Sequence, residues 1–156
     1  MDNVRSWLGG PRSTSLLAWI GVVTTIGMFV VIGMGDLVTN AGAAQGCGRS
    51  WPLCNGRLVP IFTLDTLIEF SHRFVVGIVS IGVLILAAAT FLRTPDRREI
   101  RVLAPGMLVF LALQAVLGGV AVLWPQTPAV LALHMGISLI SFSTVLLTTM
   151  LLLGET

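Results

Sequence analysis

Four long apolar stretches constrain this chain more than any other feature of its sequence. A helix needs about 20 residues, at a rise of ~1.5 Å each, to cross the hydrocarbon core of a bilayer. Stretches of that length run approximately over residues 16–38, 66–92, 102–124 and 129–153. Only one extended segment, residues 39–65, remains between them, which leaves no room for a soluble catalytic domain. The sequence therefore predicts an all-α membrane protein in which residues 1–156 form a single four-transmembrane-helix bundle.

The composition agrees with this fold class. Hydrophobic residues make up 55% of the 156 residues and charged residues only 10%, whereas charged residues make up about 25% of a typical soluble domain. The first apolar stretch is followed by Ala41-Gly42-Ala43, which resembles a signal-peptide cleavage site. However, its apolar run of about 23 residues exceeds the 7–15 residues of a secretory signal. We expect this segment to be retained as a membrane helix.

The placement of the basic residues predicts the orientation of the bundle. All nine are arginines. They include Arg5 and Arg12 before the first span and Arg93, Arg97, Arg98 and Arg101 around the connection between the second and third spans. Because cytoplasmic connections carry such an excess, we expect a multi-pass cell-membrane protein with cytoplasmic termini and an extracytoplasmic segment at 39–65. The lipid bilayer is thus an expected partner. Nucleic acid is not, since arginines that flank spans form no basic patch on a folded surface.

The chain contains two histidines, and both lie inside predicted spans. His72 and His134 each lie roughly one and a half turns from the outer end of their helix, so their depths match. An ionisable side chain in a membrane costs about 2.5–3.5 kcal/mol on insertion scales and normally faces a partner or an internal cavity. Two imidazoles at one depth on different helices predict axial ligands of a single haem iron. The alternative is a pair of hydrogen-bonded core histidines.

Two charged residues share a helix face with the first histidine. Glu69, His72 and Arg73 stand in an i, i+3, i+4 relation, which places all three on one side of the second span. We predict that Glu69 is catalytic and handles protons beside the haem edge. Arg73 is expected to pair with a haem propionate or with Glu69, since a planar guanidinium suits either carboxylate. The alternative for both residues is an ion pair that anchors the helix at the interface.

Both cysteines of the chain, Cys47 and Cys54, lie in the predicted outer loop. The outer face of a cell membrane is oxidising, and a separation of seven residues with glycines and a proline between them permits a disulfide. The spacing is not the C-x-x-C that indicates thiol exchange or metal binding. We therefore expect an extracytoplasmic disulfide loop that caps the bundle. A redox role for the pair is the alternative.

An ordered set of motifs carries a family resemblance. The set consists of Gly35-Asp-Leu-Val38-Thr39, the loop ending Trp51-Pro52-Leu53-Cys54-Asn55-Gly56, Glu69-x-x-His72-Arg73 and Leu133-His134. Together these motifs resemble the haem A synthase (CtaA) family over nearly the whole chain. Typical members of that family have eight spans in two similar four-helix halves, each with a histidine pair. This chain looks like a half-size form with a single four-helix repeat.

The resemblance implies an oxidoreductase that converts haem O into haem A by oxidising the methyl group on pyrrole ring D to a formyl group. It implies that Glu69 matters for activity, that His72 and His134 bind the haem iron, and that Cys47 and Cys54 form the outer-loop pair. The implied cofactor is haem, with haem O and haem A as substrate and product and haem B as a further candidate. Haem O synthase, the protohaem farnesyltransferase, is the expected source of haem O. The sequence does not identify the electron donor.

Other functions fit parts of the same pattern. A non-catalytic bis-histidine membrane cytochrome, or a haem-binding subunit, would have the same histidines but would need neither Glu69 nor the capped loop. A quinone-linked thiol oxidase also has four helices and outer cysteines, but it requires a C-x-x-C pair. Because the family architecture pairs two four-helix halves, we also expect this chain to form a homodimer or a higher oligomer.

Overall fold

A computed structural model describes residues 11–93, 97–124 and 127–154. Its helices are α2 (Pro11–Asn40), α3 (Leu64–Arg93), α4 (Arg98–Leu123) and α5 (Pro128–Leu153). Each of them contains a stretch that is long and apolar enough to cross a membrane. The predicted all-α fold with four spans is confirmed. The largest difference from the predicted spans is at the start of α2, which begins at Pro11 instead of residue 16, because a proline is well accommodated in the first turn of a helix.

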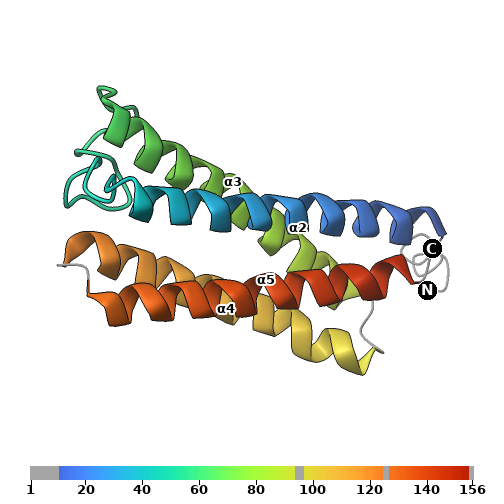
Figure 1. The fold of residues 1–156 in the computed structure, drawn as a ribbon. Helices are drawn as coiled ribbons and strands as arrows, with labels where there is room; N and C mark the ends of the chain where they lie inside the picture. The colour runs from blue at the N-terminus through green and yellow to red at the C-terminus, as the bar shows by residue number, and fades with distance from the viewer. Residues whose placement is uncertain (1–10, 94–96, 125–126, 155–156) are drawn as a thin grey trace.

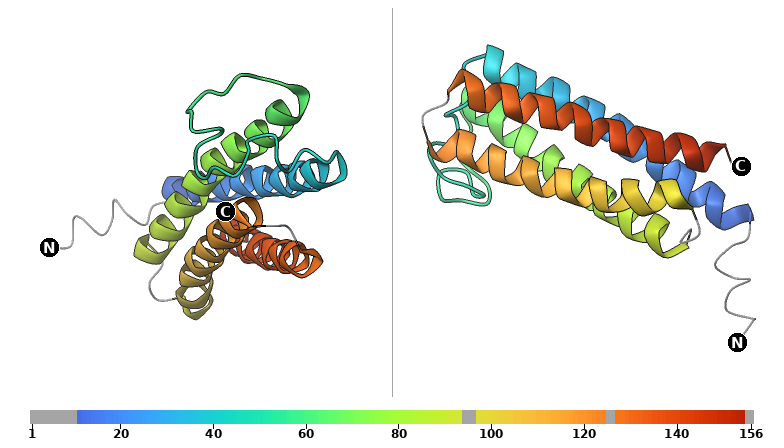
Figure 2. Two further views of the ribbon diagram at one scale, coloured as in Figure 1. Left: turned by 90° about the vertical axis from the view of Figure 1, so that its left-hand side faces the viewer. Right: turned by 90° about the horizontal axis from the view of Figure 1, so that it is seen from below.

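The four helices form a ring in which each contacts two neighbours. α2 contacts α3, α3 contacts α4, α4 contacts α5, and α5 contacts α2. The helices α3 and α5 therefore lie diagonally across the bundle from each other. Residues 41–63, between α2 and α3, lie at the same end of the bundle as the last turn of α4 and the first turn of α5 (Figures 1 and 2). We call this the loop end.

The arginines that predict the orientation lie mainly at the opposite end. Arg93 closes α3, and Arg98 and Arg101 lie in the first turns of α4, which Figure 1 shows at the end away from the loop. Arg5 lies outside the described residues. The basic side chains of the α3–α4 connection and the disulfide loop thus occupy opposite ends of the bundle.

Small residues bring the helices close together. A Cβ on Gly21 of α2 would lie 2.6 Å from Thr149 Oγ1 of α5, and a Cβ on Gly82 of α3 would lie 2.9 Å from Thr24 Oγ1 of α2. The hydroxyls of Thr25 and Thr149 are hydrogen-bonded at 3.1 Å across the α2–α5 contact. Membrane helices pack through such small and weakly polar residues, because small side chains let two helix backbones approach each other closely.

The hydrophobic core occupies the half of the bundle away from the loop end. Except for Met28, just past the middle of α2, its buried members come from the first halves of α2 and α4 and the second halves of α3 and α5 (Figure 1). They are Leu17, Ala18, Met28, Val83, Leu86, Ala87, Ile100, Ala104, Met107, Val145 and Leu152. This half of the bundle is therefore filled by its own side chains.

Nearer the loop end, the side chains of the four helices are less buried. None of the residues in four fully described segments is buried: 29–37 of α2, 70–82 of α3, 108–118 of α4 and 128–140 of α5. Side chains that face the interior of a close-packed bundle would be buried. At this level every described side chain is thus at least partly exposed in the isolated chain, and we call it the open level. Both histidines lie in it.

Candidate functional site

The two histidines enter the open level from opposite corners of the ring. His72 belongs to α3 and His134 to α5, the diagonal pair of helices. Their imidazoles are close enough to interact electrostatically. A Cβ on Gly35 of α2 would lie 3.3 Å from His72 Cε1, and a Cβ on Gly118 of α4 would lie 3.6 Å from His134 Cε1. Each imidazole therefore packs beside a glycine of a neighbouring helix, which leaves room for the ring.

Within the described residues, neither imidazole forms a hydrogen bond through its Nδ1 atom. The Nδ1 atoms of His72 and His134 are buried and have no hydrogen-bond partner among the described residues. Buried polar side-chain atoms in proteins are normally hydrogen-bonded, so an unpaired one calls for an explanation. The unpaired atoms disfavour the alternative of hydrogen-bonded core histidines.

The donor set matches a haem better than a bare metal ion. Within residues 11–93, 97–124 and 127–154, no group of three or more His, Cys, Asp or Glu side chains is placed to hold a metal ion. Two imidazoles on diagonal helices would suffice to hold a haem iron, because the porphyrin itself supplies the other four nitrogen ligands. The open level, where no described side chain is buried, would be the place for such a planar group. The residues present therefore fit a haem.

The backbone at the second histidine is held by two side chains. Gln114 Nε2 of α4 donates a hydrogen bond to the His134 carbonyl at 3.0 Å, and Ser138 Oγ donates to the same oxygen at 2.8 Å. These bonds fix α5 against α4 at the depth of the imidazole. Gln114 was not among the predicted site residues. The signal that points to it is an isolated amide within an otherwise apolar span, since such groups seek partners inside the bundle.

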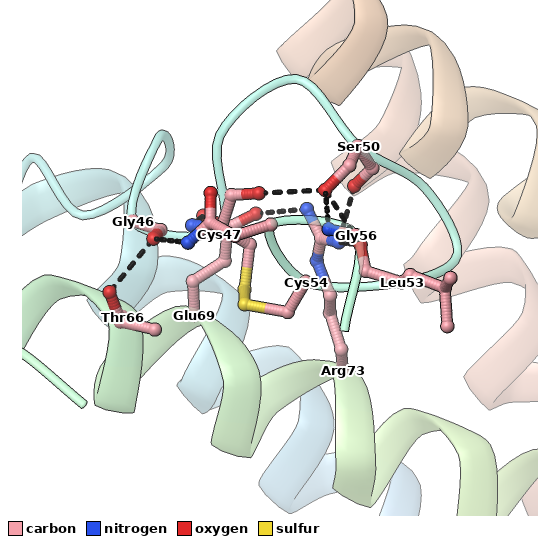
Figure 3. Close-up of polar contacts among 10 residues, drawn as sticks. Gly46, Cys47, Ser50, Leu53, Cys54, Gly56, Thr66, Glu69 and Arg73 are labelled. Carbon is pink, nitrogen blue, oxygen red and sulfur yellow. Dashed lines mark hydrogen bonds and ion pairs between the residues drawn. A yellow bond between two sulfur atoms is a disulfide. The ribbon is translucent and has the colours of Figure 1, made fainter. Parts of the chain in front are cut away.

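Glu69 and Arg73 connect α3 to the outer loop (Figure 3). Glu69 Oε1 forms an ion pair with Arg73, and Glu69 Oε2 accepts a hydrogen bond from the backbone N–H of Cys47 at 2.8 Å. Arg73 Nη1 also donates to the carbonyls of Ser50 and Leu53, at 2.8 and 3.0 Å. Of the two partners expected for Arg73, a haem propionate and Glu69, the structure shows Glu69.

A disulfide closes the loop that these charged residues hold. Cys47 and Cys54 are bonded, with their Cα atoms 4.4 Å apart, and both are buried. The predicted disulfide is confirmed. Left-handed backbone at Gly48, Asn55 and Gly56 turns the chain on either side of it, a conformation that glycine and asparagine adopt most readily. The loop is thus a compact, internally bonded unit.

Trp51 extends this loop to the other side of the bundle. A Cβ on Gly119 of α4 would lie 3.5–3.7 Å from three atoms of the Trp51 indole. Ring atoms at such similar distances indicate that the indole lies with its face on this glycine. The loop is therefore attached to α3 through Glu69 and Arg73 and to α4 through Trp51. It spans the loop end next to the two histidines.

Known proteins are similar in sequence to this chain. The family model COX15-CtaA, described as cytochrome oxidase assembly protein, matches residues 61–156. The chain is 50% identical over 135 residues to the protein named "Heme A synthase" of Bacillus licheniformis, which covers 86% of this chain and 45% of that relative. It is 47% identical to the proteins of the same name from Bacillus mycoides (87% of this chain, 44% of the relative) and Lysinibacillus sphaericus (86% and 44%). The chain spans less than half the length of these curated relatives.

Proposed function

This chain belongs to the COX15-CtaA family of cytochrome oxidase assembly proteins, and we propose that it is an oxidoreductase that converts haem O into haem A. The reaction oxidises the methyl group on pyrrole ring D to a formyl group, with dioxygen as the oxidant, electrons from a separate donor, and water as the reduced product of dioxygen. The relatives at 50% and 47% identity are named for the synthesis of haem A. The observation that carries the proposal is the diagonal pair His72 and His134, each with a buried Nδ1 that has no partner among the described residues, at a level where no described side chain is buried.

In this proposal His72 and His134 would hold the haem by binding its iron. The bound haem supplies the iron chemistry through which its own methyl substituent is oxidised. The chain supplies position: Gly35 and Gly118 leave room for the imidazoles, and Gln114 fixes the backbone at the second ligand. Two imidazoles alone do not distinguish haem O from haem B, which is therefore a further candidate for the site.

Glu69 is the residue that we propose to handle protons at the haem edge. Its side chain is 4% exposed and lies one helical turn before His72. Its two oxygens accept from Arg73 and from the Cys47 N–H. Uptake of a proton at either oxygen would weaken one of these bonds, so proton handling is coupled to the attachment of the loop. Arg73 contributes to haem binding by holding Glu69 and the loop at the polar end of the site.

We also propose that the loop end faces the outside of the cell membrane and that both termini are cytoplasmic. The arginines of the α3–α4 connection lie at the opposite end, which the positive-inside rule assigns to the cytoplasm. A disulfide at the loop end fits an oxidising compartment. Haem O is proposed to arrive from haem O synthase, the protohaem farnesyltransferase, and electrons from a separate donor.

Pigment analysis tests the proposed reaction. The full chain is produced in membranes of cells that make haem O but no haem A, and the haems extracted with the purified protein are identified by mass. We expect haem A with its formyl group, and none from matched cells that lack the chain. Haem B as the sole pigment would establish the alternative, a non-catalytic bis-histidine cytochrome or haem-binding subunit.

We propose that two copies of this four-helix unit associate, as expected from the family architecture, which pairs two four-helix halves. We expect light scattering of the detergent-solubilised protein, corrected for bound detergent, to give at least twice the mass of one chain. Amine cross-linkers are unsuitable as a second measurement, because every basic side chain is an arginine. A mass of one chain at every protein concentration, in detergent and in lipid nanodiscs, would contradict the proposal.

A further inference from the structure

One buried hydroxyl of α5 has no partner. The Ser141 side chain is 1% exposed, and its Oγ forms no hydrogen bond with any described residue. The other hydroxyls of α5 all donate to a carbonyl three or four residues earlier in the same helix. They are Ser138, Ser143, Thr144, Thr148 and Thr149. Ser141 departs from this pattern, although an unpaired hydroxyl in an apolar interior is unfavourable.

The position of this hydroxyl relates it to the histidine site. Ser141 lies seven residues after His134, on the same helix face and about 10.5 Å further from the loop end. It is the first buried residue of α5 beyond the open level. On α2, α3 and α4 the corresponding residues are Met28, Val83 and Met107. We call these four residues the floor of the open level. Three of them are apolar, so Ser141 provides the hydroxyl of the floor.

We propose that Ser141 binds the hydroxyl group of the hydroxyalkyl side chain that haem O carries and haem B lacks, which makes the site selective for haem O. This inference rests on the proposed function, in which a haem lies between His72 and His134. A haem is amphipathic, so its propionates would face the polar loop end and its opposite edge would face the apolar floor. Haem O bears a hydroxyalkyl chain at that edge, whereas haem B bears a vinyl group there.

The preference for haem O over haem B comes from hydrogen bonding. A hydroxyl both donates and accepts, so Ser141 Oγ pairs with a substrate hydroxyl in either direction. The separation of two helical turns between His134 and Ser141 is similar to the distance from a haem iron to a hydroxyl at the porphyrin edge plus the length of one hydrogen bond. With haem B in the site, the Ser141 hydroxyl would stay buried and unpaired. A site built to bond a substrate hydroxyl discriminates against the analogue that lacks it for this reason.

Binding of two haems by three proteins tests the inference. Haem-free wild type, Ser141→Ala and Ser143→Ala are titrated with haem O and with haem B, and the dissociation constants are taken from the absorption spectra. Ser143 is the matched control, because it lies on the same helix but is exposed, and its hydroxyl is already bonded to Leu139. We expect Ser141→Ala to weaken haem O binding about 5- to 10-fold, the usual size of one hydrogen bond. Haem B binding should be unchanged or tighter.

The outcomes separate this inference from the proposed function. Ser141→Thr keeps the hydroxyl and should keep the preference for haem O, and thermal unfolding of each haem-free variant checks that it folds. Equal affinity of the wild type for both haems, or a Ser141→Ala protein whose preference equals that of Ser143→Ala, would overturn the role of Ser141 and leave the proposed function intact. A wild type that binds neither haem would overturn both.

Discussion

His72→Ala and His134→Ala proteins are each expected to lose the bis-imidazole absorption spectrum and the conversion of haem O. Each substitution removes one of the two proposed axial ligands. The loss of affinity should exceed the 10–100-fold that is typical when only an outer-shell partner of a metal ligand is removed. Spectral titration with haem, followed by pigment analysis of the same preparations, measures both effects.

The structure also predicts what these substitutions should leave unchanged. Because His72 Nδ1 and His134 Nδ1 form no hydrogen bond in the described part of the chain, alanine at either position breaks none there. Haem-free variants should therefore unfold close to the temperature of the haem-free wild type. Gln114→Leu is a useful comparison, since it keeps both rings and removes only a bond to the His134 backbone. We expect it to weaken haem binding less than either histidine substitution.

A retained wild-type spectrum in either alanine variant would rule out the ligand assignment. The chain has two histidines, so no third imidazole is available within it to take over the vacant position. This makes the experiment more decisive than it would be in a histidine-rich protein.

The sequence predicted the features that depend on one segment at a time. Each helix follows from an apolar run long enough for a bilayer, and the matching depths of His72 and His134 follow from counting residues along separate spans. The disulfide follows from two cysteines in one short loop. In each case the information lies within a few tens of consecutive residues.

The remaining features depend on how the segments meet. The diagonal placement of α3 and α5 and the open level result from the ring order and the relative shifts of four helices, which no single span encodes. The bond from the Cys47 N–H to Glu69 uses a backbone donor, and every residue except proline has one. The contact of Trp51 with Gly119 joins residues 68 positions apart (51 to 119). These contacts arise only when the four helices and the loop have come together in the folded chain.

Glu69→Ala is expected to destabilise the folded protein by about 3–5 kcal/mol, the usual cost of removing one member of a buried ion pair. The Glu69 and Arg73 side chains are 4% and 15% exposed, so alanine at 69 leaves a poorly solvated guanidinium without its carboxylate. It also removes the acceptor for the Cys47 N–H. Denaturant unfolding measures the loss of stability. The rate at which a reductant opens the Cys47–Cys54 disulfide reports whether the loop has detached from α3.

A double-mutant cycle distinguishes the ion pair from a general loss of packing. Glu69→Ala combined with Arg73→Ala should cost less than the sum of the two single changes, because the pair is then absent instead of half-removed. Glu99→Ala is the control, as its carboxylate is exposed on α4 at the far end of the bundle. It should change stability by no more than about 0.5 kcal/mol. Strict additivity of the Glu69 and Arg73 effects would show that the two side chains do not stabilise each other.

Glu69→Gln separates the attachment of the loop from proton transfer. The glutamine oxygen still accepts a hydrogen bond from Cys47 or Arg73, so the disulfide should stay protected and stability should fall less than in Glu69→Ala. An amide does not accept a proton at neutral pH, so conversion of haem O should still fall by about 10²–10⁴-fold, the usual contribution of a positioned acid or base. A Glu69→Gln protein with wild-type conversion and a protected disulfide would leave Glu69 as the anchor of the loop alone. If conversion of haem O falls only when the disulfide also becomes open to the reductant, the position of the loop limits the conversion.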